Sequence, residues 1–549
     1  MRMRRTMWML VLLMAAGCHA AVDDPKGQSE ELADPVRREH AIENLQSMFN
    51  KALAAAKGDR SLPPVKTFAD AAVDNMAKTY LDHPEDSVNG GRLMMLMYEL
   101  QDPRAIPAML KALDWTHEVT EDHAVTAARA AVEMDVPSDK KGELVDAICK
   151  ALGRVEENRG VDNRMRKGFI EVLGKLGDKR ATPTLIKIVE TQDKNQNFLF
   201  NILAAQQLVK LADPTAIPTM IKALYIFAED NPAMRMNDVA TSALVASGKL
   251  SLAPLLKVLQ GQDEGANAMV KAYIGAIKMR DKDAAARMKP EAIVAAEAAY
   301  TLGKLGDRTA IDALTAEAKH EDKDRRFAAA LALVSINRED SDTAAIVATL
   351  KKVYDDAPKA GKPQMLVAVR HLYASEIMGF LEKIAVTEEK ELPPIQMYGF
   401  VSHALLANKA EAQKVKHVLE TAELIKGQVK DYAAAIKAAE ECDEKIDCWV
   451  GKLGDKDKVV LRKAANMLAR FGRGDEKAIN GLLKLFTHED IEVRNEALAA
   501  VDYMAIKGSK AAVDKIEDIE AREQGRSSWN NFKREALPTR SRLLLRTGS

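Results

Sequence analysis

The most constraining feature of the sequence is a frame that returns at a fixed distance along the chain. Residues 178–187 and 213–222 share the pattern Asp-x-x-Ala-(Ile/Thr)-x-x-x-(Leu/Ile)-Lys. The same spacing of Asp and Lys recurs in 102–111, 342–351 and 475–484, and 248–257 keeps it with glycine in place of Asp. Self-similarity at a period of about 35 residues predicts an α-solenoid, in which each repeat packs on its neighbours.

Length and composition agree with a repeat array. At 549 residues the chain is too long for one ordinary core, and no segment reads as a linker between compact domains. Aromatic residues make up only 5%, which favours closely packed short helices over sheets. The formal net charge is -1, so the overall charge gives no reason to expect a nucleic-acid partner.

Each repeat is expected to contain two amphipathic helices joined by a tight turn. Apolar residues recur at helical spacing in 169–176, the first helix of one repeat. Gly177 and Gly306 stand where a helix ends on a left-handed residue, and Asp178 and Asp307 stand where the next helix needs an N-cap. The Asp of the frame is therefore predicted to cap helices, and the same role is expected of Asp213.

The openings of the first helices give the array a family resemblance. Residues 490–497 read Asp-x-x-Val-Arg-x-x-Ala, and related openings stand at 324–328 and 457–462. This pattern resembles HEAT repeats, particularly the short bacterial kind. The resemblance implies an all-α superhelix, an α-solenoid of about ten to twelve stacked antiparallel helix pairs of the HEAT type, with the second helices on the concave surface. Its arginines are expected to pair with neighbouring repeats or turns: Arg326, Arg462 and Arg494.

The sequence suggests the following organisation. We expect a signal peptide at 1–17, a polar tether at 18–34, a helical cap or degenerate repeats at 35–90, the repeat array at 91–525 with an insertion near 261–290, and a basic C-terminal cap or tail at 526–549. The insertion is either an extra helix or a loop. In the tail, Trp529 and Phe532 are expected to cover the apolar edge of the last repeat.

The N-terminus has the pattern of an export signal. Residues 1–5 are basic, and the apolar run 7–14 is too short to span a membrane. Residues 15–18 resemble the lipobox of bacterial lipoproteins, although Ala15 stands where that motif usually has Leu. The resemblance implies a lipid anchor on Cys18 and, since no Asp follows it, the periplasmic face of the outer membrane. Cleavage to a plain secreted protein is the alternative.

Two of the remaining cysteines are close enough in sequence to bond. A short turn between helices brings Cys442 and Cys448 within reach of a disulfide, while two free thiols are the other interpretation. Cys149 lies on an apolar face and is predicted to be a small core residue.

Catalytic and cofactor signatures are absent from the sequence. There is no His-Glu-x-x-His motif, phosphate-binding loop or dinucleotide fingerprint. His117 and His123 are predicted to lie in a solvated loop rather than at a metal. The triplets 320–322 and 488–490 invite comparison with the iron-binding His-Glu pairs of deoxyhypusine hydroxylase, but they fall in turns rather than on helix faces. We therefore predict a protein without cofactor or catalytic site, with a HEAT-like enzyme or enzyme subunit as the alternative.

The lysines of the frame are the best functional candidates. Stacked one period apart, they are predicted to form a ridge that binds partners: Lys111, Lys187, Lys222, Lys257, Lys351 and Lys484. Such a ridge favours a protein partner with an acidic segment, or an anionic envelope glycan. The other interpretation is an ordinary solvent-exposed helix face, where lysine is common. The predicted function is a protein-interaction scaffold, anchored to the envelope by its lipid, that binds along a concave helical surface.

Overall fold

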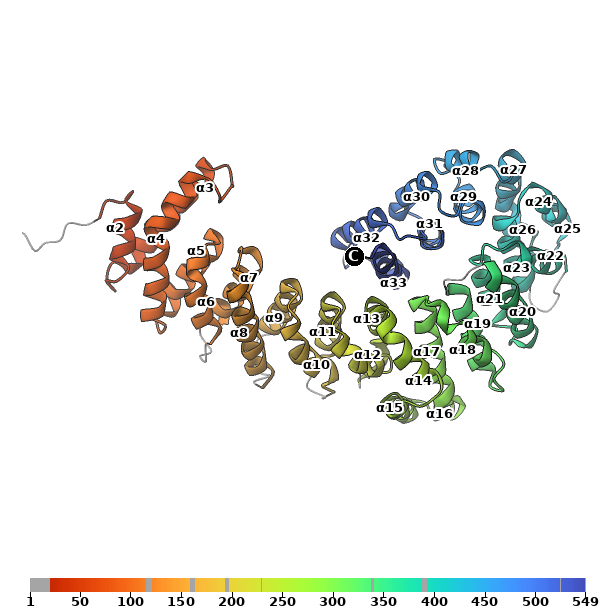
Figure 1. The fold of residues 1–549 in the computed structure, drawn as a ribbon, viewed down its shortest axis with the longest axis horizontal. Coiled ribbons are helices and arrows are strands. Elements are labelled where there is room, and N and C mark those ends of the chain that lie inside the picture. The colour runs from red at the N-terminus through yellow and green to blue at the C-terminus, as the bar shows by residue number, and fades with distance from the viewer. Residues whose placement is uncertain are drawn as a thin grey trace, which may run out of the picture. The chain divides into compact units, whose positions relative to one another are not determined.

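A computed structural model gives the structure of the chain, and it describes residues 20–114, 121–157, 163–192, 197–228, 230–336, 340–387, 393–523 and 525–548. The described residues fall into two compact units that divide after Leu211. Both units are built from stacked helix pairs, so the predicted α-solenoid is confirmed (Figure 1). Cys18 and His117, which carry two of the predictions above, lie outside the described residues.

The first unit contains only helices among its described residues. They are α2 (Pro25–Glu31), α3 (Arg38–Ala55), α4 (Pro63–Asp82), α5 (Ser87–Leu100), α6 (Ile106–Leu113), α7 (Glu121–Glu133), α8 (Ser138–Glu157), α9 (Asn163–Leu176), α10 (Thr182–Glu190) and α11 (Phe198–Leu211). From α5 onward, each first helix of a pair packs on the first helix of the next, which makes one layer, and the second helices make the other.

The second unit begins with α12 (Ile217–Ala223), a hairpin of β1 (Phe227–Ala228) and β2 (Asn231–Arg235), and α13 (Asn237–Ala246). It continues with α14 (Leu252–Leu259), α15 (Glu264–Arg280), α16 (Lys282–Arg287), α17 (Pro290–Leu305), α18 (Ile311–Glu317), α19 (Lys323–Ser335), α20 (Asp340–Asp356), α21 (Lys362–Arg370), α22 (Met378–Val386) and α23 (Pro393–Leu406). It ends with α24 (Lys409–Val415), α25 (Val418–Thr421), α26 (Lys426–Val429), α27 (Ala433–Cys442), α28 (Ile446–Lys452), α29 (Lys458–Phe471), α30 (Glu476–Leu482), α31 (Ile491–Met504), α32 (Lys510–Glu523) and α33 (Ser527–Thr547).

Short 3-10 turns connect many of the pairs. They are η1 (Pro103–Ala105), η3 (Lys179–Ala181), η4 (Pro214–Ala216), η5 (Gly248–Ser251), η6 (Arg308–Ala310), η7 (Ser375–Ile377), η8 (Lys430–Tyr432) and η9 (Leu483–Thr487). Most of them lead directly into a second helix, so the chain reverses within a few residues.

The turns between paired helices follow the predicted chemistry. Gly306 ends α17 with φ of 72°, in the left-handed region that glycine adopts at low cost. The side chain of Asp307 then accepts a hydrogen bond of 3.0 Å from the backbone N–H of Thr309. Asp178 caps η3 in the same way through the N–H of Arg180. The repeated Asp is therefore an architectural residue.

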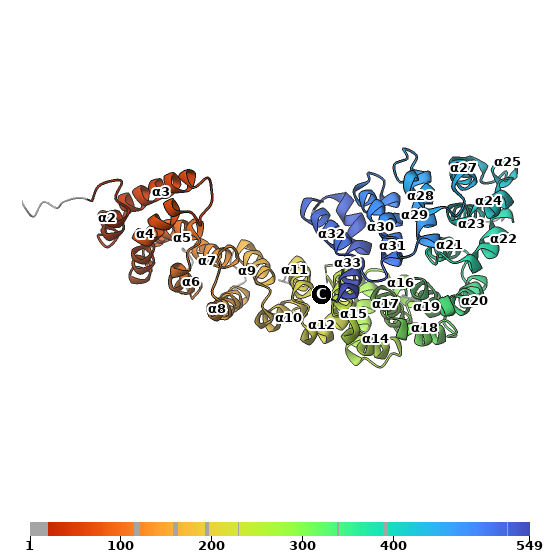
Figure 2. The same cartoon turned by 45° about the horizontal axis from the view of Figure 1, so that its top comes forward.

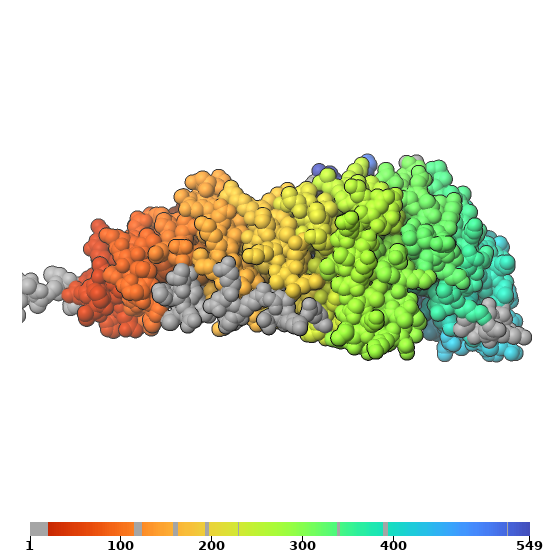
Figure 3. Space-filling view, turned by 90° about the horizontal axis from the view of Figure 1, so that it is seen from below, coloured from red at the N-terminus to blue at the C-terminus, as the bar shows by residue number. Residues whose placement is uncertain are grey.

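Close packing between repeats depends on small residues. A Cβ added to Gly303 of α17 would lie 2.9 Å from the Cα of Ala332 on α19, closer than real Cβ atoms approach backbone. The two helices bury alanine and leucine side chains against each other at this crossing, including Leu302 and Leu333. Figure 3 shows the colours of each unit following chain order over the surface, as expected when repeats contact their sequence neighbours.

Three segments of the predicted organisation contain helices. Part of the predicted polar tether 18–34 folds as α2, which packs on α3 and α4 and buries Gln28 and Ser29. Ser29 donates to the carbonyl of Ala71, so a polar sequence is held by hydrogen bonds rather than by apolar contacts. The 261–290 insertion forms the helices α15 and α16. The predicted tail 526–549 contains the 21-residue helix α33.

The hairpin of β1 and β2 was not foreseen. Its strands pair antiparallel, Phe227 opposite Arg235, between the two helices α12 and α13. Arg235 forms a 2.9 Å ion pair with Glu297 of α17, and the ring of Phe227 lies edge-on to Tyr273 of α15 with centroids 5.2 Å apart. The hairpin therefore links the inserted helix to the repeat array.

Candidate functional site

In the second unit the first helices form the inner layer and the second helices the outer layer. Figure 1 shows α13, α17, α19, α21, α23, α29 and α31 on the inside, with α14, α18, α20, α22, α28 and α30 outside them. The helix α33 lies within this curve and contacts α13, α17, α31 and α32, as the turned view also shows (Figure 2). The concave surface of this unit is therefore lined by first helices and partly occupied by α33.

This arrangement corrects the predicted lysine ridge. The frame lysines of the second unit stand on α12, α14, α20 and η9, which belong to the outer layer, so they do not line the concave surface. The HEAT resemblance implied the opposite orientation, and the local pattern of a helix pair does not fix which layer faces inward.

The side chains of the six lysines also differ in solvent exposure. Lys111, Lys187, Lys257 and Lys484 are exposed. Lys222 is half-buried against the first turn of α15, where a Cβ on Gly265 would lie 3.5 Å from its Cγ. Lys351 is half-buried, and its ammonium lies 3.4 Å from the carbonyl oxygen of Glu376. The predicted ridge is thus reduced to four open positions, two in each unit.

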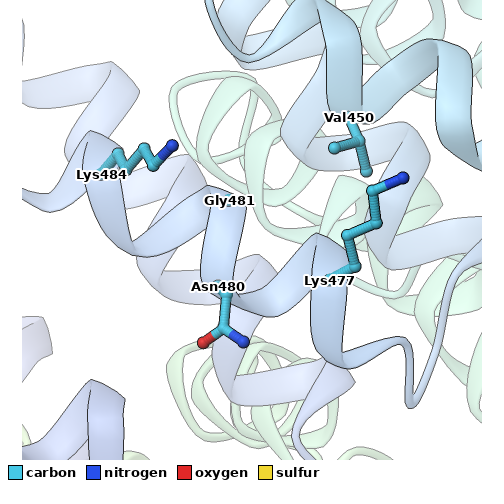
Figure 4. A pocket seen from close by; sticks show the side chains of 5 residues that line it. All are labelled: Val450, Lys477, Asn480, Gly481 and Lys484. Atoms are coloured by element: carbon cyan, nitrogen blue, oxygen red, sulfur yellow. The ribbon is translucent and has the colours of Figure 1, made fainter.

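One of these positions borders a surface hollow of about 590 Å³. Figure 4 shows Lys477 and Lys484 on α30 and η9 on either side of Gly481, with Val450 of α28 facing them. Lys477 is held by Asp447 at 2.7 Å. The hollow offers ammonium groups beside an amide and an apolar side chain, a combination that suits a carboxylate on a peptide surface.

A buried charge cluster of the second unit centres on Glu496 of α31, which is 3% exposed. Its carboxylate accepts hydrogen bonds from Arg370 at the end of α21, from His371 at 3.1 Å and from Asn466 of α29 at 3.0 Å. Arg462 of α29 adds a contact of 3.4 Å. Burial alone would raise the pKa of Glu496, but the neighbouring Arg370, His371 and Arg462 hold that pKa well below its ordinary value.

A second buried cluster lies where α29 meets the end of α23. The ammonium of Lys463 has no solvent exposure and donates to the carbonyls of Ala404, at 2.8 Å, and Ala407, near the C-terminus of α23. Burial, together with the charge of Arg470, lowers the pKa of Lys463 well below its ordinary value. Burial, followed by the charge of Lys463, lowers the pKa of His403 to about 3, so this imidazole is neutral in the folded protein. Lys463 therefore caps the C-terminal end of α23.

The contacts of α33 with α13 and α17 form a third charged group. Lys304 of α17, 9% exposed, pairs with Glu535, and the guanidinium of Arg542 donates to the carbonyl of Lys304. Arg534 lies 3.4 Å from the carboxylate of Asp238 on α13, with its guanidinium 5.4 Å from the ring centroid of Tyr300. Burial opposes ionisation of Glu535, but Lys304 lowers the pKa of this carboxyl.

The arginines of the first-helix openings pair as expected. Arg326 donates to the carbonyls of His320 and Glu321 in the preceding turn. Arg462 reaches Glu492 and Glu496 on the next first helix, and Arg494 forms two contacts with Glu523, of 2.9 and 3.0 Å. Arg462 therefore joins neighbouring repeats, whereas Arg326 holds the preceding turn and Arg494 holds the second helix of its own pair.

The histidine predictions come out differently for different residues. His320 and His488 lie in turns, where each Nδ1 accepts a 3.0 Å bond from the backbone N–H of Asp322 or Asp490. His123, predicted to be in a solvated loop, is instead a buried residue of α7 whose ring lies 3.1 Å from the hydroxyl of Tyr80 and 2.9 Å from the carbonyl of Ser87. Over the part of the chain that the structure describes, no His, Cys, Asp or Glu group could hold a metal ion.

The cysteines of the C-terminal repeats are bonded. Cys442 ends α27, Cys448 lies in α28, and their sulfur atoms are joined across a Cα distance of 5.4 Å. Cys149 is a half-buried free thiol whose pKa is raised by burial. Within the described ranges, no helix combines the length and apolarity needed to cross a bilayer.

Comparison with known proteins agrees with the repeat architecture. Residues 282–360 match the HEAT-repeat family. The chain is similar to the crystal structure of an engineered protein at 16% identity, over 88% of this chain and 98% of that one, with a TM-score of 0.29. It is also similar to the karyopherin Kap121p, seen bound to the SUMO protease Ulp1p (12% identity, 95% of this chain and 74% of that one, TM-score 0.41) and to Pho4p (11%, 93% and 69%, 0.42). No curated protein matches the sequence.

The helix pairs and their Asp caps define an α-solenoid, and residues 282–360 of it match HEAT repeats. Sequence reasoning missed the cluster around Glu496, although a signal was present. Glu496 shares a helical face with Val493, Ala497 and Ala500, and a carboxylate on an apolar stripe indicates a buried partner.

Proposed function

We propose that the protein is a non-catalytic scaffold that binds partner proteins along its helix faces, held in a bacterial cell envelope by a lipid on Cys18. The observation that carries the proposal is the stack of helix pairs, which presents one side-chain position again and again on a continuous surface. The karyopherin Kap121p, to which the chain is similar, is seen bound to the SUMO protease Ulp1p and to Pho4p.

The open frame lysines support an acidic segment in the partner. Lys111 and Lys187 lie in the first unit, and Lys257 and Lys484 lie on the outer layer of the second. Within each unit, exposed ammonium groups on different repeats attract carboxylates of a partner more strongly than one ammonium does. Each exposed pair contributes only about 0.2–1 kcal/mol, so binding requires several of them together.

Cross-linking in intact cells tests this function. We expect chains carrying Lys187→Glu and Lys257→Glu to capture much less of the partner than the parent chain. A matched control reverses two exposed lysines on first helices, Lys175→Glu and Lys323→Glu, and should retain capture. Equal capture by both double variants would contradict the lysine surface, and recovery of glycan without any protein would contradict the scaffold itself.

The anchor is tested separately. Cys18→Ser should release the protein from the membrane fraction and abolish incorporation of labelled fatty acid, since the thiol of Cys18 is the predicted acylation site. Unchanged fractionation and labelling would show that Cys18 is not lipidated.

A further inference from the structure

The helix α33 has two dissimilar faces. Toward η9 and its sequence neighbours α31 and α32 it is anchored by apolar side chains, since its residues Trp529 and Phe532 are buried and the ring centroid of Phe532 lies 6.2 Å from that of Phe486 in η9. Asp502 of α31 adds a 3.1 Å bond from Arg542 and a 3.1 Å pair with Arg546. This face holds α33 to the end of the array.

The face toward α13 and α17 is held differently. Every hydrogen bond and ion pair that the structure describes across this seam uses a charged side chain: Glu535 to Lys304, Arg534 to Asp238, and Arg542 to the carbonyl of Lys304. Lys304 is 9% exposed and Arg542 is 7% exposed, so these contacts are largely shielded from salt, and removal of one partner leaves an uncompensated buried charge. The chain connects α33 directly to α32 but not to α13 or α17, so a charge change at this seam should separate α33 from α13 and α17 while α33 remains on α31 and α32.

We infer that the surface of α13 and α17 beneath α33 is a docking site for a helix of a partner protein, and that α33 occupies this site as an intramolecular competitor. The inference rests on the proposed scaffold function and names the partner's chemistry. Separation of α33 leaves the ammonium of Lys304, the ring of Tyr300 and the carboxylate of Asp238 on one helical surface.

The groups on this surface specify the incoming helix. Lys304 requires an acidic residue, while Asp238 and the face of Tyr300 require an arginine next to it in sequence, as Arg534 and Glu535 provide. A long apolar residue about three turns further on would lie over Gly248, where Leu545 lies now. The partner segment is therefore an amphipathic helix with an adjacent Arg–Glu pair.

Tethering explains why the free site is rarely available in the parent chain. A segment attached to the same protein competes at an effective concentration of about millimolar, so a partner helix must bind more tightly than α33 or find α33 weakened. Loss of the Lys304–Glu535 pair, with like charges in its place, should raise the affinity for an added helix roughly tenfold.

A charge-swap experiment tests the inference with the full chain and a labelled synthetic peptide of residues 527–547 as the probe. The parent peptide should bind the Glu535→Lys chain at least about tenfold more tightly than it binds the parent chain, because Lys304 is retained. It should not bind the Lys304→Glu chain, which should instead bind the peptide carrying Glu535→Lys. Hydrogen exchange should show the bound peptide protecting α13 and α17.

The double variant Lys304→Glu with Glu535→Lys restores opposite charges and serves as the control for closure. It should bind neither peptide more tightly than the parent chain does. Binding of both peptides to both single variants would show unspecific exposure of apolar surface and would overturn the inference. Failure of both peptides to bind either single variant would also overturn it. If the peptide experiment overturns the inference but the chain still captures a partner protein in cells, the scaffold function remains supported and only this docking site is excluded.

Discussion

Replacement of Glu496 by glutamine is expected to destabilise the second unit by about 3 kcal/mol. Arg370 and Glu496 are each 3% exposed, and Arg462 is 6% exposed, so the carboxylate neutralises guanidinium groups that water does not reach. Removal of one member of a buried ion pair usually costs 3–5 kcal/mol, because the remaining charge is left without compensation. The glutamine carbonyl still accepts one of the hydrogen bonds, which places the expected loss near the lower limit.

Urea unfolding followed by circular dichroism, with hydrogen exchange of α29 and α31, measures this loss. The expected 3 kcal/mol corresponds to about a hundredfold increase in the population in which these helices are open. Glu492→Gln is the matched control, because Glu492 also pairs with Arg462 but is exposed, so its loss should cost at most about 1 kcal/mol.

The pH dependence gives an independent measure of the same carboxylate. Its pKa in the folded protein lies below the ordinary 4.5, so the unfolded state binds a proton more readily. The stabilisation is therefore fully present above pH 4.5 and is lost as the pH falls below that value. The glutamine variant should lack this acid-dependent part. If the two glutamine variants lose equal stability, or if the acid dependence remains, Glu496 does not neutralise a buried cluster.

Three further predictions test other parts of the structure. Between pH 7 and pH 5 the His403→Leu chain should lose about 2 kcal/mol less stability than the parent chain, because the folded imidazole has a pKa of about 3 while the unfolded one binds a proton below about pH 6.5. Unfolding midpoints at the two pH values measure this difference. Equal losses in both chains would show that His403 titrates normally when folded. Asp178→Ala should lower the free energy of unfolding of the first unit by about 1 kcal/mol, as measured by urea unfolding. The adjacent exposed Lys179→Ala should cause no measurable change. Equal effects of the two substitutions would exclude the capping role. Gly303→Ala should destabilise the protein by about 1–3 kcal/mol and lower its melting temperature, because the added Cβ meets the backbone of Ala332. Gly275→Ala, where a Cβ meets nothing within 4 Å, should instead stabilise it by about 0.5–1 kcal/mol. A tolerated Gly303→Ala would show that α17 and α19 are less closely packed than described.

The features that sequence predicted well are local in the chain. Asp178, Gly306 and Asp307 act within one turn, where a side chain reaches a backbone N–H two residues away, so spacing alone is sufficient to recognise them. The period of the frame follows from the same turns, and it identified the solenoid without any knowledge of the contacts between repeats.

The features that sequence missed depend on contacts far apart in the chain. Arg370 meets Glu496 across 126 residues, and Lys304 meets Glu535 across 231. Such contacts depend on the small rotation between successive repeats, which accumulates over many packing interactions and leaves no periodic mark in the sequence. The same rotation decides which layer of helices faces inward, and this is why the frame lysines of the second unit were predicted on the wrong surface.

The closure of the second unit by α33 has a consequence for how its repeats unfold. In an open stack the terminal repeats have one neighbour instead of two, and unfolding begins there and moves inward one interface at a time. Between α13 and α33 the stack joins its own beginning, so within this segment no repeat is terminal. Unfolding of this segment should therefore be highly cooperative, and cutting the seam between α13 and α33 should restore fraying from the ends even though every repeat keeps both of its sequence neighbours.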